Sequence, residues 1–136
     1  MSIAQPAGRM TPQQFIKKWE GVKLTERAAA HEHFIDLCHM LGQPTPAEVD
    51  SEGAWYTFEK GVTKATGGEG FADVWMRGHF AWEYKSPGRS LTDAFKQLLF
   101  YAGDLENPPL LIVCDIERYE IHTNFTGTRK EVHRFT

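Results

Sequence analysis

The sequence predicts a single α/β domain, in which a mixed β-sheet is flanked by helices in the order α-βββ-α-ββ. Three observations predict this class. Apolar residues recur at helical spacing in two segments, three aromatic-rich runs between those segments have the character of strands, and a continuous apolar run follows the second segment. The 136 residues, 41% of them hydrophobic, suffice for one domain with its own core. We therefore expect residues 1–136 to form one domain, with 1–10 as a loose tail.

Two helices are predicted before the first strand. Thr11 suits the cap of a short helix up to residue 20, and Pro12 suits its first turn. A longer helix follows over 25–41, where apolar residues recur at steps of three and four. Gly42 ends it, and the proline-containing segment 43–53 is predicted to be a loop.

The remaining elements are predicted from residue 55 onward. The predicted strands cover residues 55–62, 71–76, 80–85, 110–116 and 118–125. Ser90 and Asp93 resemble a capping box, and the helix that they begin runs to about Leu105. The apolar run 110–116 is typical of a strand buried on both faces, so residues 85–110 have the form of a crossover between parallel strands. Residues 126–136 are predicted to be a turn and a tail.

Charge and cysteine usage narrow the class of protein. A net charge of −3 argues against a protein that coats nucleic acid, although it does not exclude an enzyme that cuts DNA. Cys38 and Cys114 stand outside any metal-ligand spacing and are predicted to be buried free thiols. No apolar run approaches the ~20 residues of a membrane span, and residues 1–10 lack the apolar core of a signal peptide. We expect a cytoplasmic protein with no membrane partner.

Two carboxylates and a lysine occupy a predicted hairpin. Because side chains alternate along a strand, Glu83 and Lys85 share one face while Trp82 and Tyr84 share the other. A three-residue loop at 77–79 would pair position 76 with 80, and so place Asp73 beside Glu83. A two-residue loop would place the two acids on opposite faces.

Two adjacent carboxylates favour the binding of a cation between them. Side by side, Asp73 and Glu83 cannot both ionise freely unless a positive charge compensates them, and Mg²⁺ prefers such oxygen ligands. Lys85 could then contact an attacking water or a developing phosphate charge. The alternative is a solvated sheet face with a salt-bridging lysine. Gln97 and Tyr101 lie one helical turn apart, either as hydrogen-bond donors to the site or as a polar core margin.

Together these residues resemble the PD-(D/E)XK nuclease superfamily. Its pattern is an acid on the first helix, an Asp on one strand, E-x-K on the next strand, and often Q-x3-Y on the following helix. The matching residues are Glu26, Asp73, Glu83, Lys85, Gln97 and Tyr101. The segments TFEKGV, GFADVW, WEYKS, QLLFY and LLIVCDIERYEIHTNFTG are similar to the N-terminal nuclease domain of MmeI-like type II (IIG/IIL) restriction-modification enzymes. Ala72 stands where the superfamily pattern has proline.

This resemblance implies a restriction-endonuclease-like fold and a Mg²⁺-dependent endodeoxyribonuclease, with Mn²⁺ as a substitute. It implies that Asp73, Glu83 and Glu26 hold the metal and that Lys85 orients the attacking water or neutralises the phosphate. Gln97 and Tyr101 would help to position these groups. The implied partners are double-stranded DNA and methyltransferase and target-recognition domains, in the same polypeptide or in a partner protein. On this reading the chain is either a fragment of such an enzyme or a stand-alone relative.

Two rival interpretations use the same residues differently. A glycoside hydrolase would use two carboxylates as acid and base, but would leave Lys85, Glu26 and the Q-x3-Y helix without roles. A degenerate nuclease fold would bind DNA or a partner without catalysis, and the intact Asp, Glu and Lys argue against it. The histidines at 31, 33 and 39 form no i, i+4 pair, so a zinc site is not predicted. Glu59 is a candidate auxiliary ligand.

Overall fold

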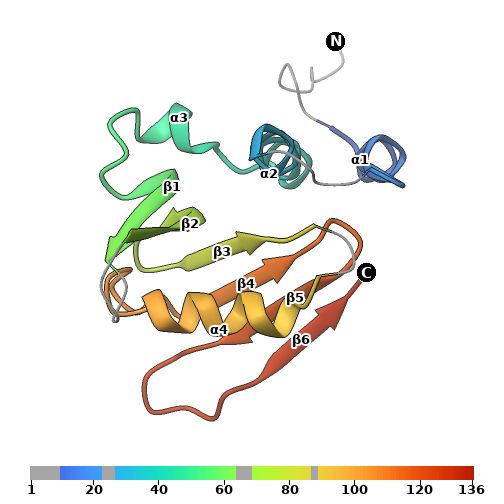
Figure 1. Cartoon of the computed structure of the whole chain (residues 1–136). Coiled ribbons are helices and arrows are strands. Elements are labelled where there is room, and N and C mark those ends of the chain that lie inside the picture. Colours follow the sequence, from blue (N-terminus) through green and yellow to red (C-terminus); the bar gives the residue numbers. More distant parts are fainter. Residues whose placement is uncertain (1–9, 23–26, 64–68, 87–88) are drawn as a thin grey trace.

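Figure 1 shows the computed structural model, which describes residues 10–22, 27–63, 69–86 and 89–136. The helices are α1 (Pro12–Trp19), α2 (Arg27–Leu41), α3 (Pro46–Val49) and α4 (Leu91–Tyr101). The strands are β1 (Tyr56–Thr63), β2 (Glu69–Met76), β3 (Phe80–Tyr84), β4 (Leu110–Cys114), β5 (Tyr119–Thr123) and β6 (Val132–Phe135). None of the described helices is long and apolar enough to cross a membrane.

The six strands form one mixed sheet in the order β1-β2-β3-β4-β5-β6. Every neighbouring pair is antiparallel except β3 and β4, which run parallel and are connected through α4. This confirms the predicted mixed sheet flanked by helices, and the arrangement is consistent with a restriction-endonuclease-like fold.

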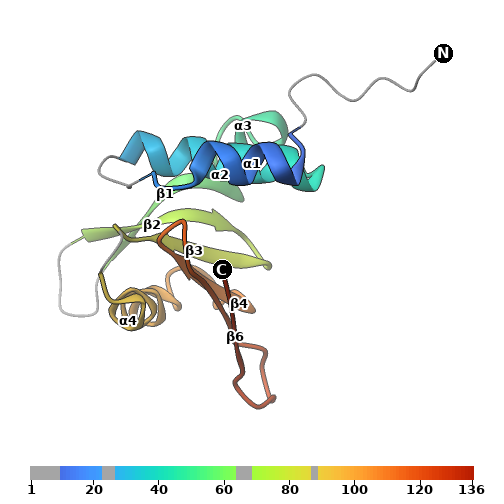
Figure 2. The same cartoon turned by 90° about the vertical axis from the view of Figure 1, so that its right-hand side faces the viewer.

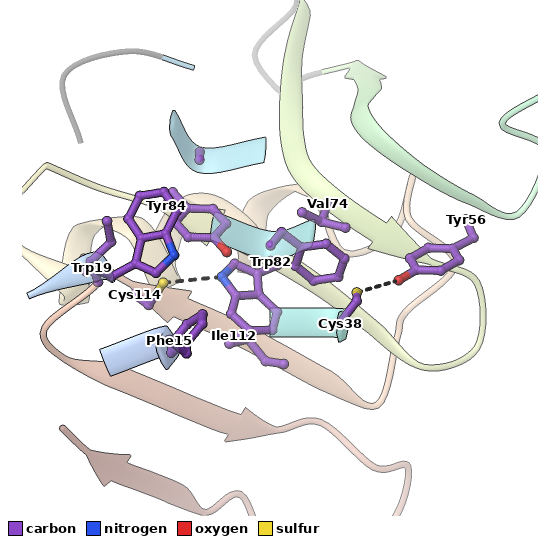
Figure 3. Packing of buried hydrophobic residues seen from close by; sticks show 12 residues of the cluster. Phe15, Trp19, Cys38, Tyr56, Val74, Trp82, Tyr84, Ile112 and Cys114 are labelled. Atoms are coloured by element: carbon purple, nitrogen blue, oxygen red, sulfur yellow. Dashed lines mark hydrogen bonds between the residues drawn. The ribbon is translucent and has the colours of Figure 1, made fainter. Parts of the chain in front are cut away.

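Helices cover both faces of the sheet. Helices α1 and α2 lie together on one face and α4 lies on the other (Figure 2). The first face buries Trp82 and Tyr84 of β3 against α1 and α2, in the cluster drawn in Figure 3. The second buries Leu111 and Val113 of β4 against Leu98 of α4. Because each buried large apolar side chain contributes about 1.5–3 kcal/mol, both layers are held mainly by apolar contact.

The two cysteines are buried free thiols in this core, as predicted. Each contacts an aromatic side chain: Cys38 Sγ lies 3.5 Å from the Tyr56 hydroxyl, and the Trp82 indole N–H points to Cys114 Sγ at 3.4 Å (Figure 3). Burial raises the pKa of both thiols, that of Cys114 to about 12. Both therefore remain protonated at neutral pH and behave as small apolar side chains.

Segment 43–53, predicted to be a loop, contains the short helix α3. Thr45 and Glu48 form a capping box, in which the Thr45 N–H donates to Glu48 Oε1 at 3.0 Å. Pro46 stands in the first turn, where its missing N–H costs nothing, so this proline begins a helix instead of preventing one.

The predicted C-terminal tail contains the strand β6. Its residues pair with β5, and all four are exposed, so they show no alternation of buried and exposed positions. Contacts with β5 fix the strand: Arg134 donates to Glu120 at 3.0 Å, and Phe135 stacks on Tyr119.

Helix α4 and strand β4 both end earlier in the chain than predicted. Helix α4 ends at Tyr101 instead of about Leu105, whose carbonyl accepts the Trp75 indole N–H at 3.0 Å. Strand β4 ends at Cys114 because Asp115 turns the chain by accepting the backbone N–H of Arg118 at 2.7 Å.

Candidate active site

The β2–β3 hairpin has the register that the three-residue loop predicts. Val74 pairs with Trp82 and Met76 with Phe80, which leaves 77–79 as the loop. Gly78 takes a φ of 75°, a left-handed conformation that glycine adopts without steric cost. The next two positions along the hairpin are Asp73 and Glu83, which therefore fall on the same face of the sheet.

The Asp73 carboxylate takes part in the backbone pairing of the hairpin. The backbone pairing between β2 and β3 ends at Val74 and Trp82. Just beyond it, the Tyr84 N–H donates to Asp73 Oδ2 at 2.7 Å. A side-chain oxygen thus serves as the acceptor for a strand N–H, which fixes the Asp73 carboxylate between the two strands.

Glu83 is a buried acid with one unsatisfied oxygen. Its side chain belongs to a residue that is 5% exposed, and its buried Oε1 has no hydrogen-bond partner. Burial, and after it the adjacent Asp73 carboxylate, raise the pKa of Glu83 to about 9, while Lys85 opposes the shift. Alternation along β3 predicts only one buried face; the structure buries Glu83 as well because α4 covers the second face.

Lys85 is tied to α4 through a chain of two hydrogen bonds. Its Nζ donates to Gln97 Oε1 at 3.3 Å, and Gln97 Nε2 donates to the Tyr101 hydroxyl at 3.2 Å. Tyr101 is 4% exposed, so it anchors the chain in the core. Glu83, Lys85 and the Q-x3-Y pair are therefore brought together on the α4 side of the sheet.

The two other candidate ligands are Glu26 and Glu59. Glu26 falls outside the described residues. Glu59 has a φ of 52° and lies 3.4 Å from His31 Nε2 of α2. Within the described ranges, no three His, Cys, Asp or Glu side chains are close enough together to hold a metal ion, so Asp73 and Glu83 form a two-carboxylate set.

A family model described as "MmeI, N-terminal domain" matches residues 10–135 of the chain. The chain belongs to the MmeI N-terminal domain family. No curated protein and no solved structure matches it significantly. The family associates the chain with restriction-modification enzymes, which confirms the resemblance to the N-terminal domain of MmeI-like enzymes.

This member of the MmeI N-terminal domain family also has an ion pair between Asp115 and Arg118, in the turn after β4. The sequence analysis did not predict it. The Lys85 N–H donates to the Cys114 carbonyl at 2.9 Å, and the following residue, Asp115, is 1% exposed. Asp115 Oδ2 accepts Arg118 Nε at 2.9 Å and Nη2 at 2.7 Å, and Arg118 Nη2 also donates to the Arg89 carbonyl. The available signal was an acid directly after a buried strand, followed three residues later by arginine.

The site combines carboxylates, which a bound cation would stabilise, with positively charged side chains, which would attract an anion. Asp73 and Glu83 offer carboxylate oxygens, while Lys85 directly follows β3 and Arg118 directly precedes β5. Such a site suits an anionic substrate that is held together with a divalent cation.

Proposed function

We propose that the chain is a metal-dependent DNA endonuclease domain, the cleavage module of a restriction-modification enzyme. The observation that carries the proposal is the buried Glu83 carboxyl, with Oε1 unpartnered, on the same sheet face as Asp73. An unsatisfied buried carboxyl beside a second carboxyl is costly for folding, and a bound cation removes that cost. Membership of the MmeI N-terminal domain family supports this context.

The donor set fits a hard divalent ion such as Mg²⁺ or Mn²⁺. Asp73 and Glu83 would hold the ion through carboxylate oxygens, and Glu26 is the proposed third ligand. When bound, the ion supplies Lewis-acid stabilisation of charge on the phosphate.

The remaining roles belong to side chains of the chain itself. In the proposed hydrolysis, a water oxygen forms a bond to phosphorus as the bond to the leaving oxygen breaks. The Lys85 ammonium orients this water or neutralises charge on the phosphate, and Gln97 holds the Lys85 side chain through the 3.3 Å hydrogen bond. Tyr101 in turn holds Gln97.

Metal-dependent nicking of supercoiled plasmid DNA by the purified chain tests the catalytic assignment. We expect nicking with Mg²⁺ or Mn²⁺, and a loss of about 10²–10³ in Lys85→Ala, because removing one charge-stabilising group typically costs that much. Lys96→Ala is the matched control, since Lys96 is an exposed lysine on α4. Equal nicking by the wild type and Lys85→Ala would contradict the catalytic role proposed for Lys85.

The non-catalytic alternative is favoured by one observation, the absence of a third metal-ligating side chain beside Asp73 and Glu83 among the described residues. Titration calorimetry with Mg²⁺ separates the two proposals. A nuclease should bind the ion and lose binding in Asp73→Asn, whereas a binding module should bind duplex DNA with no metal dependence.

A further inference from the structure

An apolar groove of about 690 Å³ lies on the face of the sheet opposite to the candidate active site. Phe15 and Ile16 of α1, Leu41 of α2, Ile121 of β5 and Phe135 of β6 contribute to its walls. In Figure 1 the C-terminal end of the chain lies beneath α1, at the right-hand edge of the molecule. The groove is therefore separate from Asp73, Glu83 and Lys85.

Large apolar side chains stand exposed in the groove. Ile16 is 63% exposed, Leu41 58% and Phe135 49%. Single exposed apolar side chains are ordinary, but three that line the same groove mark a surface that another molecule covers. Because these side chains are 49–63% exposed, the groove is open along its length and is not a cavity that would enclose a small ligand.

The charged residues of the groove have one sign. They are Glu20 and Glu117, both exposed, and neither carboxylate forms an ion pair within the described part of the chain. An apolar floor with acidic edges is complementary to an amphipathic helix that carries basic residues beside its apolar face.

The family indicates where such a helix comes from. Phe135 of β6 and the adjacent Thr136 themselves line the groove. The family is one of N-terminal domains. We infer that this groove docks an amphipathic helix with basic flanks, supplied by another domain of the restriction-modification enzyme. This inference rests on the family and on the groove, and holds whether or not Lys85 is catalytic.

Binding of two designed peptides by the 136-residue chain tests this inference. Both are about 18 residues long, five helical turns, with leucines at i, i+3, i+4 and i+7 spacing. The first has lysines at the remaining positions and the second has glutamates. Fluorescence anisotropy of the labelled peptides should show binding of the lysine peptide and much weaker binding of the glutamate peptide.

Substitutions locate the binding to the groove. Ile16→Ser with Leu41→Ser should weaken binding about tenfold or more, because two apolar contacts are lost. Phe100→Ser is the control, since Phe100 is 59% exposed on α4, on the other face of the sheet. Circular dichroism and thermal unfolding verify that these surface variants fold.

Charge reversal tests the acidic edges. Glu20→Lys with Glu117→Lys should reverse the preference towards the glutamate peptide. Glu52→Lys with Glu131→Lys changes net charge equally at exposed positions outside the groove, and should leave the preference unchanged. Equal binding of the two peptides, or an unaltered Kd in Ile16→Ser with Leu41→Ser, would overturn the inference. So would self-association of the wild type that this double variant abolishes, because the occupant would then be a second copy.

Discussion

Glu83 is held in its neutral form by its surroundings. With a pKa of about 9 it carries a proton at neutral pH as long as no cation is bound. A divalent cation would have to displace this proton, so metal binding and deprotonation are coupled. The buried carboxyl thus links the stability of the domain to both pH and metal.

The direction in which pH changes the free energy of unfolding can be measured in a buffer that contains a chelator, so that no metal ion is bound. The folded-state pKa of Glu83 lies above its ordinary value of 4.5, so the folded state binds more protons between pH 4.5 and about 9. The contribution of Glu83 to the free energy of unfolding is therefore full below pH 4.5 and is lost as pH rises to about 9. Urea unfolding should show this decline, and Glu83→Gln should flatten it because glutamine stays neutral.

Added Mg²⁺ provides the second arm of that experiment. At pH 9 it should raise the free energy of unfolding of the wild type and leave Glu83→Gln nearly unchanged. A wild type and a variant with the same pH dependence would show that Glu83 is not the group that titrates.

Single residues of the site were predictable where local rules apply. Strand alternation and the odd-length loop predict Asp73 beside Glu83, and helical spacing predicts Gln97 beside Tyr101. Burial of Glu83 was not predictable, because it depends on how α4 crosses the sheet. The hydrogen bond from the Tyr84 N–H to Asp73 was missed because it lies beyond the backbone pairing of β2 and β3, which ends at Val74 and Trp82.

At the scale of elements, the β2–β3 turn sets the register that the site needs. Gly78→Ala should lower the free energy of unfolding by about 1–2 kcal/mol, because a Cβ is disfavoured at a φ of 75°. Nothing lies within 4 Å of the added Cβ, so the cost is conformational and not steric crowding.

Gly103→Ala is the matched control for Gly78→Ala. Its added Cβ also meets nothing within 4 Å, and its φ is not in the left-handed range, so we expect a neutral or slightly stabilising effect. Urea midpoints for both variants check this. Equal stability of the two variants would contradict the role assigned to Gly78.

Two elements, strand β6 and helix α3, were not predicted from the sequence. Strand β6 depends on Glu120 and Tyr119 of β5, which no local pattern reveals. Helix α3 was missed for a different reason. Its capping box is a local signal, but Pro44 and Pro46 after Gly42 predict the end of the preceding helix and obscure a new helix that begins at Pro46 itself. The long helix α2 and the buried strand β4 were predicted. The helical spacing of one and the continuous apolar run of the other follow directly from packing against a core.

At the scale of the whole molecule, His33 ties the helical layer to the sheet. It is fully buried on α2, with Nδ1 2.8 Å from the Tyr84 hydroxyl of β3 and Nε2 3.1 Å from the Tyr119 hydroxyl of β5. Burial lowers its pKa to about 4, and the nearby Asp36 opposes the shift only in part. Protonation would place an uncompensated charge between the two layers.

We therefore expect the domain to lose stability in acid. Because the folded-state pKa lies below the ordinary 6.5, the contribution of His33 is present above pH 6.5 and is lost as pH falls to about 4. Glu83 has the opposite slope above pH 4.5, so the measurement belongs in a Glu83→Gln background. There, His33→Gln should reduce the acid-dependent loss of unfolding free energy and lower stability at pH 7 by about 1–3 kcal/mol. His79→Gln, at an exposed loop position, should keep the full loss. If the loss of unfolding free energy in acid were unchanged in His33→Gln, groups other than His33 would be responsible for it.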